Sequence, residues 1–299
     1  MPAGPPVAPL RLGLRLLALA QPDLPPREGR VVARAQRLQL SGAERAAEAE
    51  VQRLRRQLRT SDASVEVVDY GAGTRGGERP PVRPVREVYG RAATGPAWGR
   101  FLFLLARALR PQRVLELGTN LGVGSAHLAA ALAQTEAEGG PAGRLVTLEG
   151  APALAALAAG HLRALGHTVG PEPGRRVRVE VGPFAETLAP VAEAEGPFGL
   201  VFVDGHHEEA AALAYVDALR PHLAPGALLV LDDVEPGRPV RRAWRRLLAA
   251  EPGAPAFYAG KYGLLFLGPR ERTGGAATAL ARETSPRPTE PAARPAAGA

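Results

Sequence analysis

The stretch from Val114 to Ser125 constrains the fold more than any other part of the sequence. It begins with apolar residues typical of a buried strand, turns through Gly118, Gly122 and Gly124, and continues directly into a helical pattern. Gly118 lets the chain leave the strand with an unrestricted φ angle, and the next two glycines let the backbone approach a ligand that a Cβ atom would displace. This order of strand, turn and helix predicts a nucleotide-type cofactor site.

The order of the glycines narrows the choice of cofactor. They follow a G-x-x-x-G-x-G order with an acid, Glu116, two residues before the first, whereas the dinucleotide fingerprint is G-x-G-x-x-G. The Glu116 carboxylate would attract the cationic amino group of a methionine moiety and repel a pyrophosphate. The pattern therefore favours S-adenosylmethionine over NAD, although glycines in a strand-to-helix turn can also be purely structural. The residues of this stretch expected to contact the cofactor are Glu116, Gly118, Thr119, Asn120, Gly122, Gly124 and Ser125.

The charge of the chain is unevenly distributed. The 299-residue sequence has 37 basic and 30 acidic residues, a formal net charge of +7, and an isoelectric point near 10.6. Residues 1–113 hold 20 Arg and 10 acidic residues, whereas residues 114–299 hold 17 basic and 20 acidic residues. The part with the glycine motif is therefore slightly acidic, and the sequence lacks the alternation of Arg and aromatic residues that reads bases. These features argue against a nucleic-acid partner.

Residue counts and the lengths of apolar runs exclude several classes of protein. The sequence has no cysteine, which excludes disulfides, thiolate metal sites and a thiolate nucleophile. No apolar run approaches the roughly 18 to 20 residues of a membrane span. The Leu10–Ala20 segment has too short an apolar core for a signal peptide and predicts a short amphipathic helix. We therefore expect a soluble, cytoplasmic protein without a membrane partner.

Residues 1–84 are predicted to form an N-terminal helical extension and linker. The segment Ser41-Gly-Ala-Glu44 has the pattern of a capping box and opens a helix that runs to about Arg59. Val65–Val68 is β-branched and strand-like. Residues 74–84 are dense in Gly, Pro and Arg and predict a flexible loop, which ends the extension.

From residue 85 to residue 268 the pattern predicts one α/β domain. Apolar strands alternate with helices, which indicates a parallel sheet with right-handed crossovers, and the tight Gly260–Gly263 turn between the last two strands predicts a β-hairpin. The fold class is therefore a doubly wound, mostly parallel, seven-stranded Rossmann-like sheet, the methyltransferase variant, with a C-terminal β-hairpin. Residues 269–299, rich in Ala and Pro, predict a disordered tail. The predicted strands are 113–117, 145–148, 177–181, 200–203, 227–231, 256–259 and 264–267.

Residues after the second and third of these strands complete the predicted cofactor site. Glu149 ends the second strand, and ligands of doubly wound sheets bind outside the carboxyl ends of the strands. A carboxylate there can accept hydrogen bonds from both ribose hydroxyls, although an acid at a strand end can also be an ordinary surface residue. Gly182 and Phe184 follow the third strand and would pass the adenine, with Phe184 either a face for the base or a core residue.

Three carboxylates follow the fourth and fifth strands. Asp204 ends the fourth strand, where we expect it to contact the cofactor and to take part in catalysis, and Asp232 and Asp233 end the fifth. Converging carboxylates are destabilising unless a cation or hydrogen bonds neutralise them. A Mg²⁺ ion held by these three residues would remove the repulsion and lower the pKa of a bound hydroxyl. The alternative is that Asp204 alone faces the site while Asp232 and Asp233 cap a turn.

His206 and His207 follow directly and are alternative candidates for a catalytic general base. An imidazole near its unperturbed pKa is suited to taking a proton from an attacking oxygen, although surface histidines commonly have no such role. The Asp-Gly-His-His strand end also differs from the Asn-Pro-Pro-Tyr type that holds an amino nitrogen in many N-methyltransferases. The difference favours an oxygen nucleophile.

With these residues in view, the chain resembles class I S-adenosylmethionine-dependent methyltransferases, most closely the bacterial O-methyltransferase-like group. The resemblance covers about residues 66–268 and rests on Asp69–Gly73, Leu115–Gly122, Phe202–His206 and Leu231–Val234. It implies a metal role for Asp204, Asp232 and Asp233 and the base role for His206 or His207. The catechol-type relatives generally place a lysine near the position of His207 and an acid–amide pair where this chain has two acids.

The resemblance and the residue patterns together predict transfer of a methyl group from S-adenosylmethionine to a hydroxyl of a small molecule. Mg²⁺ is a second candidate cofactor, and a homodimer is left open. Two alternatives remain: an RNA or other N-methyltransferase that uses the basic N-terminal region, and a module that binds the cofactor without turnover.

Overall fold

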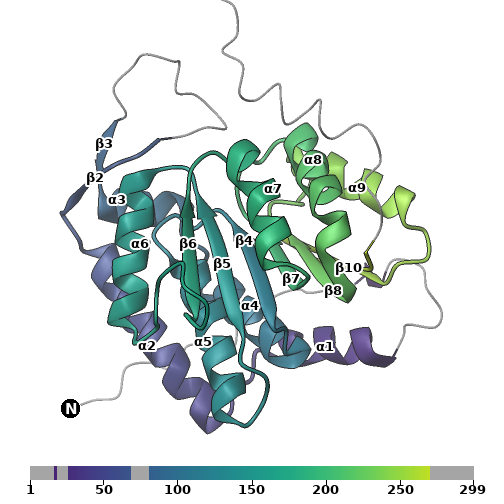
Figure 1. The fold of residues 1–299 in the computed structure, drawn as a ribbon, viewed down its shortest axis with the longest axis horizontal. Helices are drawn as coiled ribbons and strands as arrows, with labels where there is room; N and C mark the ends of the chain where they lie inside the picture. The colour runs from purple at the N-terminus through teal and green to yellow at the C-terminus, as the bar shows by residue number, and fades with distance from the viewer. Residues whose placement is uncertain (1–16, 19–25, 69–80, 270–299) are drawn as a thin grey trace, which may run out of the picture.

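The structure is a computed structural model that describes residues 17–18, 26–68 and 81–269 (Figure 1). Three sequence predictions lie wholly or mostly outside these ranges: the tail after residue 269, the Asp69–Gly73 motif, and most of the predicted Leu10–Ala20 helix. The helices are α1 (Pro26–Gln36), α2 (Gly42–Arg59), α3 (Val85–Ala92), α4 (Pro96–Leu109), α5 (Val123–Ala137), α6 (Pro152–Ala164), α7 (Phe184–Glu195), α8 (Glu209–Leu219), the short 3₁₀ helix η1 (Arg220–His222) and α9 (Val240–Ala250). The strands are β1 (Leu17–Ala18), β2 (Ser64–Glu66), β3 (Val82–Pro84), β4 (Arg113–Leu117), β5 (Arg144–Glu149), β6 (Val177–Val181), β7 (Phe198–Val203), β8 (Leu223–Leu231), β9 (Ala256–Ala259) and β10 (Tyr262–Leu267).

A large sheet lies at the centre of the molecule, with the strand order β1-β9-β10-β8-β7-β4-β5-β6 (Figure 1). Strands β4 to β8 run parallel to one another, and β10 lies antiparallel between β8 and β9. The chain moves outward from β4 to β6 and then returns to place β7 beside β4, so the strand order reverses at the β4–β7 pair. Ligands of such sheets bind outside the carboxyl ends of the strands at this switch point. The seven-stranded doubly wound sheet predicted from the sequence is confirmed, and β1 adds a short eighth strand at its edge.

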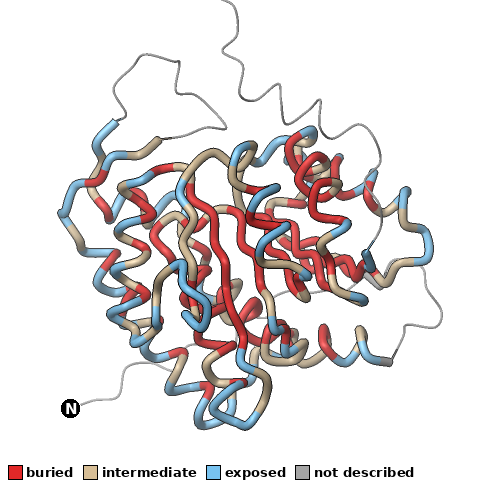
Figure 2. Tube along the Cα trace, in the orientation of Figure 1, coloured by how far each residue is buried: buried red, intermediate tan, exposed pale blue. Residues whose placement is uncertain are grey.

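Helices cover both faces of the sheet, and the strands between them are buried (Figure 2). One hydrophobic cluster joins α1, α2, α4 and α5 to one face, and a second joins α7, α8 and α9 to the other. Strand β7 shows how one segment serves both. Leu200 and Phe202 belong to the first cluster, whereas Val201 and Val203 belong to the second, because successive side chains of a strand point to opposite faces.

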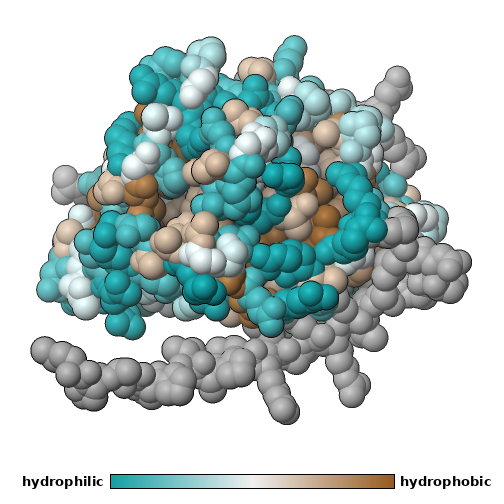
Figure 3. Space-filling model, turned by 90° about the horizontal axis from the view of Figure 1, so that it is seen from below, coloured by the Kyte–Doolittle hydropathy of each residue, from teal (hydrophilic) through white to brown (hydrophobic). Residues whose placement is uncertain are grey.

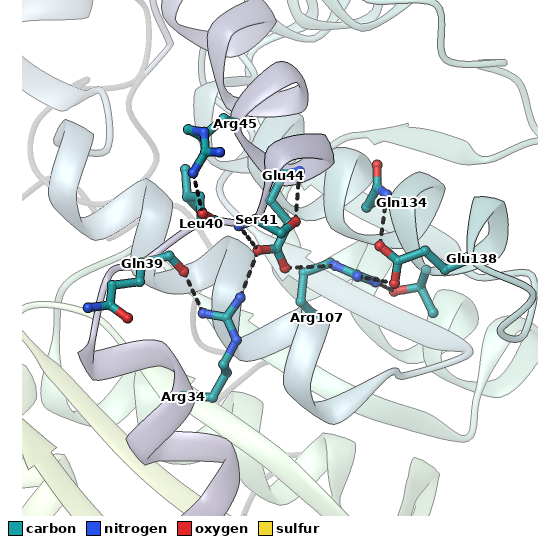
Figure 4. A network of polar contacts seen from close by, with 10 residues as sticks. Arg34, Gln39, Leu40, Ser41, Glu44, Arg45, Arg107, Gln134 and Glu138 are labelled. Atoms are coloured by element: carbon teal, nitrogen blue, oxygen red, sulfur yellow. Dashed lines mark hydrogen bonds and ion pairs between the residues drawn. The ribbon is translucent and has the colours of Figure 1, made fainter.

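The N-terminal helices α1 and α2 are joined to α4 by a polar network around Glu44 (Figure 4). Ser41 and Glu44 form the capping box predicted from the sequence: the Ser41 N–H donates to Glu44 Oε2 at 2.8 Å, and the Glu44 N–H donates to Ser41 Oγ at 3.3 Å. The buried Glu44 carboxylate also accepts hydrogen bonds from Arg34 of α1 at 2.7 Å and from Arg107 of α4 at 3.3 Å. A single side chain therefore caps α2 and connects three helices.

Two short strands correct the sequence predictions for the N-terminal part. Leu17 and Ala18 are not helical but pair antiparallel with Tyr258 and Phe257 of β9. Without this pairing β9 would present unpaired backbone groups at the sheet edge, and a short extended segment satisfies them. Val82–Pro84 was expected to be loop but forms β3, which pairs with β2. Periodicity within a single segment does not reveal either pairing, because each depends on a partner strand elsewhere in the chain.

Candidate active site

A cavity of about 1210 Å³ opens at the carboxyl ends of β4, β5, β7 and β8. Its walls are formed by the loop after β4, the start of α7 and the segments after β7 and β8. Residues of β3 and α3, from the N-terminal part of the chain, also line it. Its position is the one that the switch point of the sheet predicts. The predicted site residues that line it are Gly118, Thr119, Asn120, Gly124, Glu149, Phe184, Asp204, His206, His207, Asp232 and Asp233.

The glycines of the loop after β4 allow protein atoms to approach one another closely. Gly118 has a φ angle of +103°, and a Cβ atom on it would lie 2.2 Å from the backbone oxygen of Asp204. A Cβ atom on Gly124 would lie 2.6 Å from Glu116 Oε1. Gly122, with a φ angle of +79°, caps the N-terminus of α5 beside Ala158 and does not line the cavity. The loop is therefore held against β7, β4 and α6, with Gly118 and Gly124 still facing the cavity.

Glu116 and Ser125 lie beneath this loop. The Glu116 carboxylate is 1% exposed and accepts hydrogen bonds from the hydroxyls of Ser125 and Thr147, the latter at 2.6 Å. Burial raises the pKa of Glu116 to about 7, although the two hydroxyls lower it. Neither Glu116 nor Ser125 lines the cavity, so both support the loop from below. Their contact with a cofactor remains a prediction.

Glu149 lies at the end of β5 and lines the cavity. Its Oε2 accepts the backbone N–H of Asn120 at 2.7 Å and its Oε1 accepts that of Ala151 at 2.9 Å. Burial raises the pKa of Glu149 above its ordinary value, although the backbone hydrogen bonds lower it. Each carboxylate oxygen has a second lone pair, so the group can accept two more hydrogen bonds. The structure therefore offers a fixed acceptor pair at the position predicted for the ribose.

The wall after β6 and β7 is aromatic. Phe184 begins α7 and contacts Tyr215 of α8 edge to face, with ring centroids 5.7 Å apart. A Cβ atom on Gly205 would lie 2.8 Å from the Phe184 ring, which shows how closely the loop after β7 packs on this ring. Phe184 thus faces the cavity and also packs against the second hydrophobic cluster. Gly182 does not line the cavity, and its N–H donates to the backbone oxygen of Glu149 at 3.0 Å.

The three carboxylates after β7 and β8 lie together, as the sequence predicts, and Lys261 from the β9–β10 turn lies among them. Lys261 Nζ is 2.5 Å from Asp232 Oδ2 and 3.7 Å from Asp233 Oδ1. Desolvation, together with the negative charge of Asp232, raises the pKa of Asp204 well above its ordinary value. Burial lowers the pKa of Lys261, but the attraction of Asp232 and Asp204 outweighs it and the pKa is raised. The ammonium is thus the cation that Asp232 and Asp233 contact.

The predicted Mg²⁺ site does not fit this arrangement. Mg²⁺ requires a near-octahedral set of oxygen ligands, and a resident ammonium beside Asp232 repels a second cation. Within residues 17–18, 26–68 and 81–269, no group of three or more His, Cys, Asp or Glu side chains could hold a metal ion. The metal role of Asp204, Asp232 and Asp233 therefore stays a prediction, and the cation that contacts Asp232 and Asp233 in this structure is Lys261.

The two histidines after Asp204 both line the cavity but have different partners. His206 has a φ angle of +52°, and its Nδ1 lies 2.9 Å from the hydroxyl oxygen of Tyr215. The Nδ1 of His207 lies 3.5 Å from Asp233 Oδ2, and the His207 side chain is 46% exposed. His207 is therefore paired with a carboxylate and also open to the cavity.

Sequence reasoning missed Lys261, and one signal could have found it. The predicted hairpin returns beside β8, and antiparallel pairing places the start of β10 at the end of β8, where Gly263 is opposite Leu231. The turn before β10 therefore lies beside the acids that follow β8. The single lysine of the chain occupies that turn.

The strand order, with β10 antiparallel between β8 and β9, and the cavity at the carboxyl ends define a Rossmann-like methyltransferase fold. Residues 115–234 match a family described as a methyltransferase domain. Among curated proteins, a catechol O-methyltransferase of Mycobacterium tuberculosis is 38% identical over 144 residues, and one of Niastella koreensis is 32% identical over 143 residues. Each match covers 48% of this chain and 58% of the relative, so the chain spans little more than half the length of these relatives.

Among solved structures, the O-methyltransferase TomG from Streptomyces achromogenes, involved in tomaymycin synthesis and in complex with SAM, is 28% identical with a TM-score of 0.47. The match covers 60% of this chain and 82% of TomG. Over the matched residues the chain is thus similar to a methyltransferase domain and to two catechol O-methyltransferases.

Proposed function

We propose that this chain transfers a methyl group from S-adenosylmethionine to a hydroxyl oxygen of a small, catechol-like molecule. The observation that carries the proposal is a single cavity that holds both the glycine loop with Glu149 and the Asp204–His207 and Asp232–Asp233 segments. The first set suits a nucleoside cofactor and the second suits acid–base chemistry beside it. The two catechol O-methyltransferases similar to this chain support the same acceptor class.

In this proposal the cofactor lies along the loop after β4. The free lone pairs of Glu149 accept hydrogen bonds from the ribose hydroxyls. The backbone N–H of Asn120 holds the Glu149 carboxylate in place. The Phe184 ring offers a face for the adenine. The sulfonium then lies toward Asp204, on the side of the cavity that holds the histidines.

The chemical step is an in-line displacement. A lone pair of the acceptor oxygen forms the new O–C bond, the S–C bond breaks with its electron pair remaining on sulfur, and the hydroxyl proton passes to a base. We assign the base to His207, because Asp233 lies beside His207 Nδ1 and favours the tautomer whose Nε2 accepts a proton. Most of the rate enhancement would come from holding donor and acceptor at attack distance.

The test combines calorimetry with a turnover assay. The chain should bind S-adenosylhomocysteine and should methylate members of a catechol panel, detected by mass spectrometry. Glu149→Ala should weaken S-adenosylhomocysteine binding at least about tenfold, since each lost charge-assisted hydrogen bond is worth about 1.5 to 3 kcal/mol. His207→Gln should keep that affinity and lose turnover. A protein that ignores S-adenosylhomocysteine and binds NAD instead would refute the proposal.

The same assay separates the alternatives. Methylation of RNA with a steep salt dependence would indicate a nucleic-acid substrate, and binding of S-adenosylhomocysteine without any product would indicate a module without turnover. In the part of the chain that the structure describes, no helix is both long enough and apolar enough to cross a bilayer. A cytoplasmic location stays a prediction, for which cell fractionation is the direct test.

The homodimer left open by the sequence also stays a prediction. Figure 3 views the molecule from below the orientation of Figure 1, and this face is mainly hydrophilic, with apolar side chains visible between polar ones. Val82 and Val181 are the exposed large hydrophobic residues of the described part, at 60% and 47%. Size-exclusion chromatography with light scattering would decide the oligomeric state.

A further inference from the structure

We propose that Lys261 supplies the positive charge of this active site in the place of a divalent metal ion, and that its ammonium contacts the acceptor oxygen during methyl transfer. The inference rests on the proposed function for the identity of the reaction. It goes beyond that function because it assigns a catalytic residue from an element, the β9–β10 turn, that lies outside the segment matched by the methyltransferase family.

The position of the ammonium is the first argument. Lys261 lines the cavity together with Asp204, Asp232 and Asp233, and its Nζ is 2.5 Å from Asp232 Oδ2. The Lys261 side chain is 25% exposed whereas that of Asp232 is 1% exposed. The ammonium therefore lies between a buried carboxylate and the open cavity, where a bound acceptor can reach it.

The backbone around Lys261 holds the ammonium in this position. The Lys261 carbonyl accepts the N–H of Val234, the residue after the two acids, at 3.0 Å. Gly263 is paired with Leu231, the last residue of β8, so the turn is connected to the acid-bearing segment on both sides of the two acids. The Lys261 ammonium also lies 5.9 Å from the centre of the Tyr262 ring. The lysine is therefore held by the segment that carries its partners and by the pairing of the strand that follows it.

The charge balance is the second argument. Both oxygens of Asp232 already have donors: Oδ1 accepts the Asp233 N–H at 2.7 Å and Oδ2 accepts Lys261. Asp233 faces Lys261 on one side and His207 on the other. Carboxylates removed from water need a paired cation, and Lys261 is the cation that contacts this group. A divalent ion bound to the same oxygens would lie against the ammonium.

The ammonium has a donor left for catalysis. It carries three N–H groups, of which one is directed at Asp232 and a second faces the more distant Asp233. The third is available to the acceptor oxygen. When the hydroxyl gives its proton to the base, negative charge develops on that oxygen, and a preorganised donor beside it stabilises the charge before the S–C bond breaks. No metal ion is needed for this step.

The first measurement is metal binding, which does not depend on turnover. Titration of the full chain with Mn²⁺, followed by the electron paramagnetic resonance signal of the free ion, should show no stoichiometric binding, with or without S-adenosylhomocysteine. Turnover of the methyl donor should be unchanged by EDTA. One Mn²⁺ bound per chain, together with loss of turnover in EDTA, would overturn the proposal. A chain that neither binds S-adenosylhomocysteine nor makes product would instead refute the proposed function, and the Mn²⁺ result would still be readable.

The second measurement uses variants of the lysine. Lys261→Met should lower kcat about 100-fold or more, the effect expected for loss of one preorganised donor at a developing oxyanion, while S-adenosylhomocysteine affinity changes little. The pH of half-maximal kcat should move upward, because the acceptor hydroxyl loses the cation that favours its ionised form. Lys261→Arg keeps the charge and should restore part of kcat.

Arg246→Met is the matched control, since it removes one positive charge from an exposed position on α9 and should leave kcat unchanged. Circular dichroism and S-adenosylhomocysteine binding establish that each variant is folded. A folded Lys261→Met protein with wild-type kcat and an unshifted pH profile would show that Lys261 only neutralises its neighbours, and would overturn the catalytic assignment.

Discussion

At the scale of single residues, Glu116 is an acidic side chain that is buried beneath the candidate active site. Its carboxyl group is enclosed beneath Gly124 and is held by two hydroxyl donors rather than by a cation. Burial raises its pKa to about 7 from an ordinary value of 4.5. The carboxyl therefore changes its charge close to neutral pH, directly under the loop that faces the cavity.

This shift predicts a pH dependence of stability. Between pH 4.5 and about 7 the folded protein holds a proton that the unfolded chain has released. The contribution of Glu116 to the free energy of unfolding is therefore fully present below pH 4.5 and is lost as the pH rises through about 7. Glu116→Gln cannot ionise, so its free energy of unfolding should rise relative to wild type by about 3 kcal/mol across this window, at about 1.4 kcal/mol per pKa unit.

Urea titrations of both proteins at pH 4, 5, 6, 7 and 8 measure this difference, and subtraction cancels the titration of groups common to both. A difference that stays constant over the whole series would contradict the prediction. It would mean that the Glu116 carboxyl loses its proton at the same pH in the folded and unfolded chains.

Single residues also show what sequence reasoning can reach. Gly118, Glu149 and Asp204 are placed at the cavity by the rule that ligands bind at the carboxyl ends of parallel strands, and that rule needs only strand positions. The enclosure of Glu116 and the contacts of Lys261 depend on which side chains fill the space between elements. The spacing of residues in the sequence does not show which side chains fill this space. The metal hypothesis was therefore based on three acids alone, because the sequence pattern does not show that Lys261 lies beside them.

At the scale of elements, the polar network at the start of α2 links local and tertiary structure. The Ser41–Glu44 capping box is a local signal, readable in four residues, whereas the contacts of Glu44 with Arg34 and Arg107 join separate helices (Figure 4). The Glu44 side chain is 4% exposed, whereas those of its partners Arg34 and Arg107 are 35% and 10% exposed.

Two substitutions separate these contributions. Ser41→Ala removes only the hydroxyl cap and should lower the free energy of unfolding by about 1 kcal/mol. Glu44→Ala also leaves Arg34 and Arg107 without their shared carboxylate and should lower it by about 3 kcal/mol, the range found when one partner of a buried ion pair is removed. Glu50→Ala, exposed on the same helix, should change it by less than about 0.5 kcal/mol. Urea unfolding measures all three.

Equal losses for Ser41→Ala and Glu44→Ala would contradict this reading, since they would reduce the role of Glu44 to that of a cap.

The helix itself was predictable because its period and its cap lie within one segment. The strands β1 and β3 were not, since an extended segment of two or three residues has no period and gains its hydrogen bonds from a distant partner.

At the scale of the whole molecule, the sheet separates two hydrophobic clusters, and each cluster is built from different helices of the chain. The first contains the buried side chains of α1 and α2 together with those of α4 and α5, and the second contains those of α7, α8 and α9. The sequence divides the chain at residue 84, which assigns α1 and α2 to an extension. In the structure their side chains, such as Leu54 at 4% exposure, share the first cluster with the sheet.

The sharing of this cluster predicts that the N-terminal helices unfold together with the methyltransferase domain. The two tryptophans are suitable probes, because Trp98 packs against the first cluster and Trp244 lies in the second. In single-tryptophan variants, made with Trp98→Phe or Trp244→Phe, fluorescence should report the same urea midpoint.

Leu54→Ala in α2 removes buried methyl groups and should lower the free energy of unfolding by about 2 to 5 kcal/mol. Because the sheet connects both clusters, Leu54→Ala should move the Trp244 transition as far as the Trp98 transition. A shift confined to Trp98 would show that α1 and α2 unfold separately and that the division at residue 84 is a true domain boundary.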